Sequence, residues 1–407
     1  MNSRLFSLTK SLSRRRFHHT AVRTNVIMGI ETSCDDTGCA IVDSSGNILG
    51  ECLNSQQQVH INHGGIMPPV AKELHEQHIE RVVNEALMSS KLKFKELNAI
   101  AATVKPGLPM SLLVGMGYGK KLAREHNKPF IPIHHMEAHA LTIRMIEKVK
   151  FPFLVLLISG GHCLLNLVQD VDKFLLLGQS LDDAPGEALD KFARRMKLHI
   201  LQEYSSMSGG RAVEVAATKG DPNAFEFPMS LAHYRDCNFS VAGLKNTARK
   251  YILKLEKTHE VEPDQIVPKM EDLCASFQLS IARHICHRVQ RAMEYVSLRE
   301  LLPPDEEKTL VVSGGVACNK FIRGCVEQVC LEMGYRLLAP PPHLCTDNGA
   351  MIAWNGMERW KAGKGVIDPS SPEFDEVDIQ GRCILGEDMR EDVAEANIKC
   401  KWVKLKI

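Results

Sequence analysis

Short apolar runs alternate along this chain with longer stretches in which apolar residues recur at a helical period. A polar corner at 32–37 separates the first two apolar runs, and this arrangement predicts a β-hairpin with polar side chains at its turn. The elements predicted for the first part of the chain are strands at 26–28 and 39–42, a helix at 70–89, a strand at 99–104, a helix after the 106–109 turn, a strand at 131–133 and a helix from about 136.

The same order of elements starts again near residue 152. An apolar strand at 151–158 ends in the corner Ser159-Gly160-Gly161, and a returning strand follows at 163–168. A further buried strand at 310–312 ends in Ser313-Gly314-Gly315 and leads into a helix. Because the pattern of hairpin, helix, strand and helix occurs twice, the sequence predicts two homologous α/β lobes that face a cleft.

The same patterns divide the chain into four segments. Residues 180–300 are mostly helical and richer in charge than the rest, and we interpret them as an elaboration of the second lobe. Beyond residue 365 the pattern is too irregular to assign. The predicted segments are a leader at 1–25, an N-terminal lobe at 26–151, a C-terminal lobe at 152–365 and a C-terminal segment at 366–407.

The leader has a composition of its own. No Asp or Glu occurs before Glu31, whereas basic residues are interleaved with Ser, Leu and Phe. This composition is typical of a mitochondrial transit peptide and predicts the mitochondrial matrix as the location. The alternative is a disordered basic tail that binds nucleic acid. Cleavage would remove six positive charges and leave a mildly acidic protein, the six being Arg4, Lys10, Arg14, Arg15, Arg16 and Arg23.

The overall composition is that of an ordinary soluble globular protein, with 44% hydrophobic and 24% charged residues among 407. The 50 basic and 49 acidic residues exclude a polycationic surface over the whole chain, so any contact with nucleic acid must come from local patches. The longest apolar run, at 151–158, is too short to span a bilayer, and we predict no membrane contact. Thirteen cysteines without a CxxC pair predict reduced thiols rather than disulfides or a zinc finger.

His135 and His139 are the first candidates for chemistry. They lie four residues apart, so a helix places both imidazoles on one face, where two nitrogens can reach one metal ion. Glu137 points about 160 degrees away from them by helical geometry, so the motif lacks the general base of an HExxH protease. The alternative is a pair of histidines whose hydrogen bonds are satisfied within the fold.

Two further kinds of position suit a phosphorylated ligand. The Gly-Gly corners at 159–161 and 313–315 follow apolar strands, where glycine lets backbone N–H groups approach an anion. Asp35 and Asp36 lie at the polar corner, either as orienting carboxylates or as ordinary turn residues. Asp347 precedes an apolar helix, where it is an N-terminal cap, a metal ligand or both.

Other polar groups are interpreted as surface features. The pairs His75 with His78 and His284 with His287 lie on amphipathic helices, and we predict that all four are solvated. Basic clusters occur at 91–95, 191–197 and 245–254. They either contact nucleic-acid phosphates or form solvated faces, and no aromatic residues are interleaved with them to stack on bases.

Six motifs in this order and spacing resemble the universal Kae1/TsaD/Qri7 family of tRNA adenosine threonylcarbamoyltransferases, over about residues 26–360. With the basic leader, the resemblance is to the mitochondrial members of the family. The motifs are Gly29-Ile-Glu-Thr-Ser-Cys-Asp-Asp-Thr37, His135-Met-Glu-Ala-His139, Leu157-Ile-Ser-Gly-Gly-His162, Asp183-Ala-Pro-Gly-Glu-Ala-Leu-Asp190, Ser313-Gly-Gly-Val-Ala-Cys-Asn319 and Thr346-Asp-Asn-Gly-Ala350.

The resemblance implies a fold and a set of site residues. The fold is the two-lobed actin, Hsp70 and sugar-kinase type (ASKHA), an α/β fold with duplicated lobes around a cleft. The metal ligands would be His135, His139 and Asp347, holding one divalent ion per subunit, iron or zinc. Asp35 matches an acidic position that matters for activity. The implied substrate contacts are Leu157, Ile158, Ser159, Gly160, Gly161, Asp190, Gly210, Glu214, Asn319 and Thr346.

The implied reaction transfers threonylcarbamoyl from threonylcarbamoyl-AMP to N6 of the adenosine adjacent to the anticodon, position 37, in mitochondrial tRNAs that read ANN codons. A separate synthase would supply the adenylate, and the family leads us to expect a homodimer. A metal-dependent glycoprotein endopeptidase is the alternative, against which the position of Glu137 argues. An ATP-dependent chaperone of the same fold is a third hypothesis, and it gives the two histidines no role.

Overall fold

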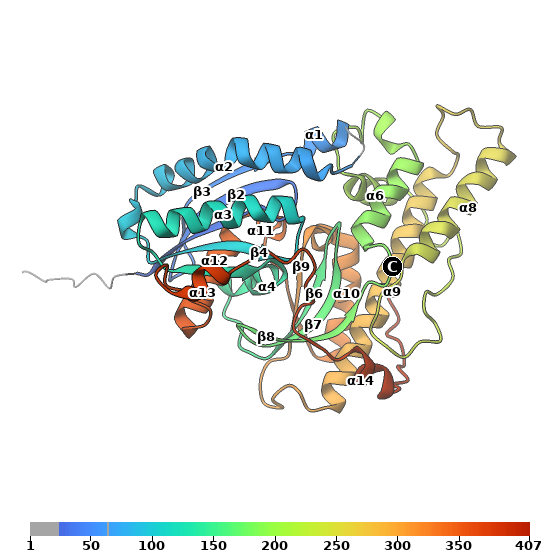
Figure 1. Cartoon of the computed structure of the whole chain (residues 1–407). Coiled ribbons are helices and arrows are strands. Elements are labelled where there is room, and N and C mark those ends of the chain that lie inside the picture. The colour runs from blue at the N-terminus through green and yellow to red at the C-terminus, as the bar shows by residue number, and fades with distance from the viewer. Residues whose placement is uncertain (1–23, 63–64) are drawn as a thin grey trace, which may run out of the picture.

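The computed structural model of the chain describes residues 24–62 and 65–407. Apart from residues 24–25, the predicted leader lies outside the described residues, and it stays a prediction. The described chain forms two β-sheets on which helices pack (Figure 1). No helix in these two ranges is both long and apolar enough to cross a membrane.

The first sheet consists of β1 (Val26–Glu31), β2 (Asp36–Asp43), β3 (Ile48–Ser55), β4 (Ala99–Lys105) and β5 (Phe130–His134). Its order is β3-β2-β1-β4-β5. β1 pairs antiparallel with β2 and parallel with β4, which confirms the hairpin predicted around the polar corner. The polar residues at the ends of β1, β4 and β5 therefore meet at one edge of the sheet.

The second sheet consists of β6 (Phe153–Ile158), β7 (Cys163–Asp170), β8 (Lys173–Gln179), β9 (Thr309–Ser313), β10 (Arg336–Leu338) and β11 (Glu387–Asp388). Its order is β10-β9-β6-β7-β8-β11. Apart from β11, strands β6 to β10 take the places and directions of β1 to β5, which confirms the predicted internal repeat. The sequence pattern does not predict β8, because no Gly or Pro turn signal separates it from β7.

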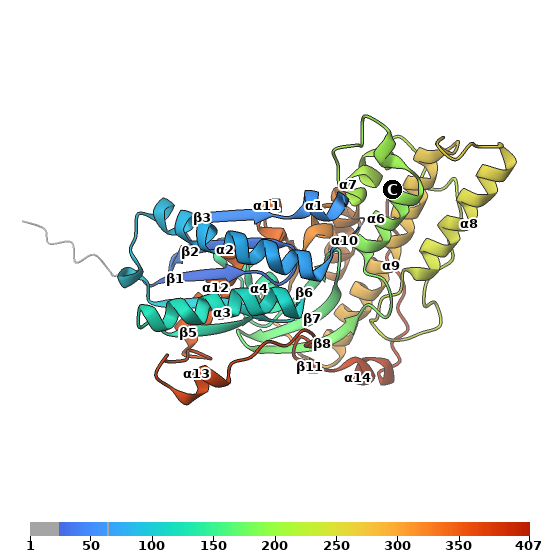
Figure 2. The ribbon, with the colours of Figure 1, turned by 45° about the horizontal axis from the view of Figure 1, so that its top comes forward.

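Helices cover both sheets, and the helical character predicted for 180–300 is confirmed. The first sheet carries α2 and α3 on one side in both overall views (Figures 1 and 2). The helices are α1 (Gln57–Asn62), α2 (Pro68–Ser90), α3 (Pro109–Glu125), α4 (His135–Leu141), α5 (Ile143–Ile146), α6 (Pro185–Arg195), α7 (Gly209–Ala217), α8 (Ala242–Thr258), α9 (Met270–Leu298), α10 (Lys320–Met333), α11 (Pro342–Cys345), α12 (Gly349–Ala362), α13 (Pro372–Glu376) and α14 (Arg390–Glu395).

Alternate residues of the first sheet face two separate cores. Met28 and Ile30 pack with the α2 and α3 side chains, whereas Ile27 packs with α12. This alternation is the period of two that a strand imposes. Helix α12 belongs in sequence to the predicted C-terminal lobe, yet it lies on the first sheet and so returns the chain to β1.

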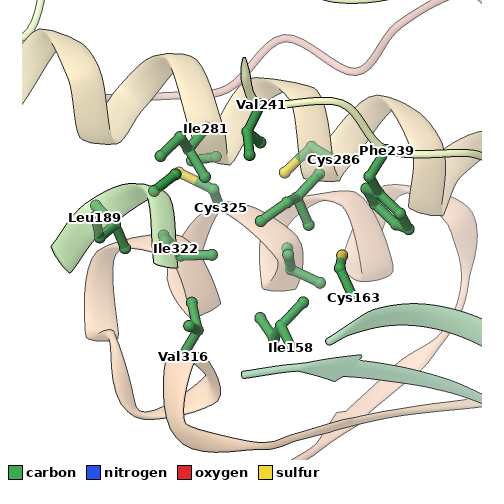
Figure 3. Close-up of a cluster of buried hydrophobic side chains, with 14 of the residues drawn as sticks. Ile158, Cys163, Leu189, Phe239, Val241, Ile281, Cys286, Val316, Ile322 and Cys325 are labelled. Carbon is green, nitrogen blue, oxygen red and sulfur yellow. The ribbon is translucent and has the colours of Figure 1, made fainter. Parts of the chain in front are cut away.

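The core of the second sheet is larger and contains several thiols. Figure 3 shows Cys163, Cys286 and Cys325 among the aliphatic side chains between the sheet, α9 and α10. All thirteen cysteines are free thiols. Burial raises the pKa of the Cys325 thiol to about 11, so this thiol stays protonated and behaves as a small apolar group.

Candidate active site

Helix α4, which follows β5, and the loop before α12 together carry the candidate metal ligands. Nε2 of His139 lies 3.1 Å from Oδ1 of Asp347, and Nε2 of His135 lies 3.5 Å from the same oxygen. One ligand atom from each of the three residues lies within 4.8 Å of the others. The fold thus brings together two imidazoles and a carboxylate that are more than 200 residues apart in the chain.

Asp347 is not the cap of the helix that follows it. Asn348 takes that position, and its side-chain oxygen accepts a hydrogen bond from the backbone N–H of Met351 at 2.8 Å. The capping role that the sequence left open for Asp347 is therefore wrong. Because Asn348 satisfies the helix terminus, the Asp347 carboxylate is free to face the histidines.

The carboxylate of Glu31 orients the imidazole ring of His135. Its carboxylate lies 3.2 Å from Nδ1 of His135 and accepts hydrogen bonds at 2.5 Å from the Thr103 hydroxyl and the backbone N–H of Ser33. Glu31 is fully buried, so it needs these donors. A proton held on Nδ1 of His135 leaves Nε2 bare and directed towards Asp347, the arrangement known from carboxylate–histidine–metal triads.

The charges of this cluster support one another. Burial opposes the charged form of His135, but the carboxylates of Asp347 and Glu31 outweigh burial and raise the pKa of His135 to about 9. Burial likewise opposes the charged form of Asp347, and the imidazoles of His135 and His139 nevertheless lower its pKa. A divalent cation would take the place of the protons as the positive partner, and two imidazole nitrogens with one carboxylate oxygen suit zinc or iron.

Sequence reasoning missed two contributors to this cluster. Thr103 lies at the end of β4, beside Glu31 at the end of β1, and only the strand pairing places them together. His162 lies near the imidazoles of His135 and His139. Burial is the main cause that lowers the pKa of His162 to about 4, and the charges of the other two imidazoles add to it, so the His162 ring is neutral. The signals available in the sequence were a polar residue near the end of an apolar strand, for Thr103, and the last position of a Gly-Gly corner between two strands, for His162.

Glu137 lies on the opposite side of α4, as its spacing predicts. Its carboxylate forms a largely buried ion pair with Arg359 of α12 at 2.5 Å. The pair ties the helix that carries both histidines to the helix that follows Asp347. The Glu137 carboxylate therefore holds two elements together and does not face the candidate metal.

The two Gly-Gly corners lie side by side. β6 and β9 are parallel neighbours, with Leu157 beside Ser313, so the corners after them share one edge of the second sheet. Leu157 and Ile158 are the last residues of β6, and the Ser159 hydroxyl accepts backbone hydrogen bonds that shape the first corner. A Cβ atom built on Gly160, Gly161 or Gly315 would meet no atom within 4 Å, so these corners face open space.

The remaining predicted contacts lie on α6, α7 and α10. Asp190 accepts a hydrogen bond from the backbone N–H of Gly210 at 2.8 Å. Glu214 accepts one from the backbone N–H of Lys320 at 2.8 Å, directly after Asn319, which caps α10. These two bonds join Asp190 to Gly210 and Glu214 to Lys320, the residue after Asn319. Thr346 is exposed and directly precedes Asp347 in the chain.

Asp35 and Asp36 differ in their surroundings. Asp35 lines a cavity together with residues of α1, α6 and α7. The hydroxyl oxygen of Ser33, two residues earlier, lies 3.1 Å from Nδ1 of His135. Burial raises the pKa of Asp36 to about 7, with the neighbouring carboxylates adding to the effect. Asp35 is thus the member of the pair that faces a ligand-sized space.

Two of the four histidines interpreted as solvated are buried instead. His75 lies between the Thr37 hydroxyl at 2.7 Å and the carbonyl oxygen of Cys34 at 3.0 Å, and it holds the polar corner against α2. His284 accepts a hydrogen bond from the backbone N–H of Ser240. The prediction was wrong for both, because charged neighbours on their helices masked positions that face the core.

Part of the basic clusters is neutralised within the fold. Lys191 and Lys245 both pair with Asp183, and Arg195 forms a two-bond pair with Glu256. Arg194, between these residues, is exposed at the rim of the cavity that Asp35 lines. The charge available to a phosphate is therefore smaller and more local than the sequence suggests.

Comparison with known proteins places the chain in context. The family model described as "TsaD: tRNA N6-adenosine threonylcarbamoyltransferase" matches residues 47–354. The chain is 49% identical to a Homo sapiens protein named tRNA N6-adenosine threonylcarbamoyltransferase, mitochondrial, over 94% of this chain and 91% of that protein. A Danio rerio protein of the same name is 48% identical over 98% and 97%.

A solved structure supports the fold independently. The HypF structure from T. kodakarensis matches with a TM-score of 0.53 at 16% sequence identity, covering 83% of this chain and 48% of that one. At this identity the likeness concerns the fold alone. Together with the duplicated strand order, it confirms the two-lobed α/β architecture of the actin, Hsp70 and sugar-kinase type.

Proposed function

The chain belongs to the tRNA N6-adenosine threonylcarbamoyltransferase family, and from this we propose that it transfers threonylcarbamoyl from threonylcarbamoyl-AMP to N6 of the adenosine adjacent to the anticodon. The protein is a transferase that acts on tRNA in the mitochondrion, as are its relatives by name. Matrix tRNAs that read ANN codons are the proposed substrates. The observation that carries the assignment is near 50% identity over more than nine tenths of the chain.

The metal centre is part of the proposal. His135, His139 and Asp347 would hold one divalent ion, iron or zinc, while Glu31 fixes the proton of His135 on Nδ1. When bound, the ion supplies Lewis-acid polarisation of the carbamoyl carbonyl. The three residues fit this role because their ligand atoms converge and because the Glu31 carboxylate beside Nδ1 of His135 leaves Nε2 as the nitrogen that would bind the ion.

The chain's own residues would position the two reactants. The corners at 159–161 and 313–315 suit the phosphate of the adenylate, since Gly160, Gly161 and Gly315 face open space and leave the backbone accessible. In the reaction, N6 of the adenosine forms a bond to the carbamoyl carbon, the bond from that carbon to the phosphate oxygen breaks, and AMP leaves with the electron pair. N6 loses one proton. Positioning dominates such a step, because the amine is a weak nucleophile and AMP a good leaving group.

The endopeptidase alternative has little support in the geometry. A peptidase of the HExxH kind needs a carboxylate near a metal-bound water. Glu137 is instead paired with Arg359, away from the ligand atoms of His135 and His139. Threonylcarbamoyl-AMP has to come from a separate synthase, and a homodimer is proposed by analogy with the family.

The test is a reconstituted reaction. Protein without residues 1–25 is mixed with threonylcarbamoyl-AMP and an unmodified ANN-reading tRNA, and the digested RNA is analysed by mass spectrometry. We expect threonylcarbamoyladenosine with the unaltered protein, and its loss with a chelator or with His139→Ala. Undiminished product from His139→Ala with no bound metal would refute the metal assignment. No product from protein that still binds metal and AMP would favour the chaperone hypothesis.

A further inference from the structure

The exposed faces of helices α2 and α3 carry cations that are paired with acids one turn away. On α2, Arg81 lies 3.1 Å from Glu85. On α3, Lys121 lies 3.9 Å from Glu125. Pairs with this spacing stabilise a solvated helix slightly and leave it without net charge. A helix face that carries cations without such acids therefore has a charge that this kind of pairing does not explain.

Helix α8 has such a face, and both overall views place this helix at the outer edge of the molecule (Figures 1 and 2). By helical geometry its four exposed cations lie within about 140 degrees of the helix circumference, on the side opposite the buried residues. Within the described ranges of the chain, none of the four side chains has an ion-pair or hydrogen-bond partner. These residues, here called the α8 cationic face, are Arg249, Lys250, Lys254 and Lys257.

The inner side of α8 is neutralised by contrast. Glu256 is the one acid in the helix, and it forms a two-bond pair with Arg195 of α6. Lys245, the remaining cation of α8, pairs with Asp183. The acid that could balance the outer side is thus already engaged on the inner side.

Helix stability does not account for the α8 cationic face either. Like charges four residues apart, as in Lys250 and Lys254, destabilise a helix slightly. The helix dipole favours a cation only in the last turn, where Lys257 lies. The chain as a whole is balanced, with 50 basic and 49 acidic residues, so this local excess is not a consequence of a basic composition. A polyanionic partner would supply the missing counter-charge.

The N-terminal end of α8 is connected to the first Gly-Gly corner. Asp182 accepts hydrogen bonds from the backbone N–H groups of Val241 and Ala242 at 2.9 and 3.3 Å. Gly186, four residues after Asp182, donates its backbone N–H to the carbonyl oxygen of Ser159 at 3.2 Å. Measured along the helix from its first residue, the α8 cationic face extends from about 10 to about 23 Å. The face therefore leads outwards from the corner proposed to hold the adenylate phosphate.

We propose that the α8 cationic face binds the phosphate backbone of the acceptor tRNA, outside the nucleotide that reacts. The proposal rests on the proposed transferase function and adds a positioning surface for its RNA substrate. Contacts between cations and phosphates fix the position and orientation of a nucleic acid without reading its sequence. Four unpaired cations on one side of a rigid helix suit such a contact.

An anionic membrane surface fits this face less well. Helices that lie on membranes need an apolar side that enters the lipid. The apolar side of α8 is buried in the fold through Leu244, Ala248 and Ile252. Leu253 is the exposed large apolar side chain of the helix. RNA is therefore the polyanion that the face fits best.

Two variants with equal changes of charge test the proposal. Glutamine is used in both because it keeps a high helix propensity. The test variant changes the α8 cationic face through Arg249→Gln, Lys250→Gln and Lys254→Gln. The control variant changes exposed lysines just before β4, at the end of that strand away from the candidate metal ligands, through Lys91→Gln, Lys93→Gln and Lys95→Gln.

Filter binding of an unmodified ANN-reading tRNA to the full chain, over a series of KCl concentrations, gives the readout. At low salt we expect the test variant to bind about tenfold more weakly and the control to stay within about twofold of the unaltered protein. Each phosphate contact contributes about 0.7–0.9 to the slope of log affinity against log salt, so that slope should fall by about 2–3 in the test variant. The KM for tRNA should rise by the same factor as the dissociation constant, with a much smaller change in kcat.

A variant that keeps the charge separates electrostatics from packing. Arg249→Lys, Lys250→Arg and Lys254→Arg together should restore the affinity and the salt slope of the unaltered protein. Weak binding by this variant as well would show that the side chains act through packing, which would overturn the proposal.

Other results also overturn it. Equal weakening of the test and control variants would show that tRNA senses only the overall charge. Unchanged tRNA affinity in the test variant would remove α8 from the RNA surface. If that variant instead loses binding to phosphatidylglycerol vesicles, the partner is a lipid surface. Product formation by the unaltered protein is measured separately, so absence of product counts against the proposed function and not against this surface.

Discussion

The chemistry of the site depends on which nitrogen of His135 carries the proton. A histidine that binds a metal through Nε2 needs an acceptor for the proton on Nδ1, and a buried carboxylate is a strong one. Glu31 provides this acceptor and is itself held by Thr103 and Ser33. Glu31, which orients the candidate ligand His135, is thus as well buried and hydrogen-bonded as His135 itself.

Replacing Glu31 by Gln should weaken metal binding by roughly 10–100-fold, since the amide no longer favours the proton on Nδ1 of His135. Metal affinity of the chelator-treated protein, measured by competition with a chromogenic chelator, checks this. Glu51→Gln is the matched control, because Glu51 is an exposed acid on β3. Equal affinities of the two variants would show that Glu31 has no role in the metal centre.

The contact of helix α12 with strand β1 determines where Asp347 stands. A Cβ atom on Gly29 would lie only 2.1 Å from the backbone nitrogen of Ala353, so helix and strand touch through backbone atoms. The Arg359–Glu137 ion pair joins the same helix to α4. Together these contacts set the register between the elements that carry the three candidate ligands.

Gly29→Ala should destabilise the protein by more than about 3 kcal/mol, because backbone atoms of α12 cannot yield to the added methyl group. Gly117→Ala is the matched control. An added Cβ there meets nothing within 4 Å, and alanine in an exposed helix is worth up to about 1 kcal/mol more than glycine. Urea unfolding gives both values, and equal stabilities would contradict the close contact.

At the scale of the whole molecule, the described residues form two sheets that share one strand order apart from β11, and the candidate site draws on the strand ends of both. The candidate metal ligands belong to the first sheet and its helices, whereas the Gly-Gly corners end strands of the second. In the proposed function, one half of the duplicated fold would hold the metal ion and the other half the phosphate. The cavity lined by Asp35 and Asp190 has walls both from the polar corner of the first sheet and from the helices that follow the second sheet.

The predicted leader is expected to determine where in the cell the whole protein is located. Residues 1–25 fused to a fluorescent protein should carry it into mitochondria, because an acid-free segment with interleaved basic and apolar residues is an import signal. Replacing Arg14, Arg15 and Arg16 by Gln should leave the fusion in the cytosol, which microscopy with a mitochondrial dye will show. Import that is unaffected by these replacements would exclude a transit peptide of this kind.

Local patterns predicted the elements well where one period was clear. The strands at β1, β2, β4 and β6 and the helix α2 follow directly from the order of apolar residues. His75 was wrongly predicted to be solvated. The strands beneath α2, and not the acidic neighbours on the helix, determine which way this side chain points. Thr103 could not be assigned a role, because its partner Glu31 lies on a strand 72 residues away.

By itself, the sequence determined the repeat of two α/β halves, the pairing of His135 with His139 and the motifs that identify the family. These are properties of short segments, whose period and spacing are fixed by covalent geometry. Only the tertiary structure decided that Asp347 faces the histidines, that Glu31 orients one of them, and that Asp35 lines a cavity with α6 and α7. Such features depend on which distant strands and helices pack together. That choice is determined by the free energy of the whole chain and not by any short segment.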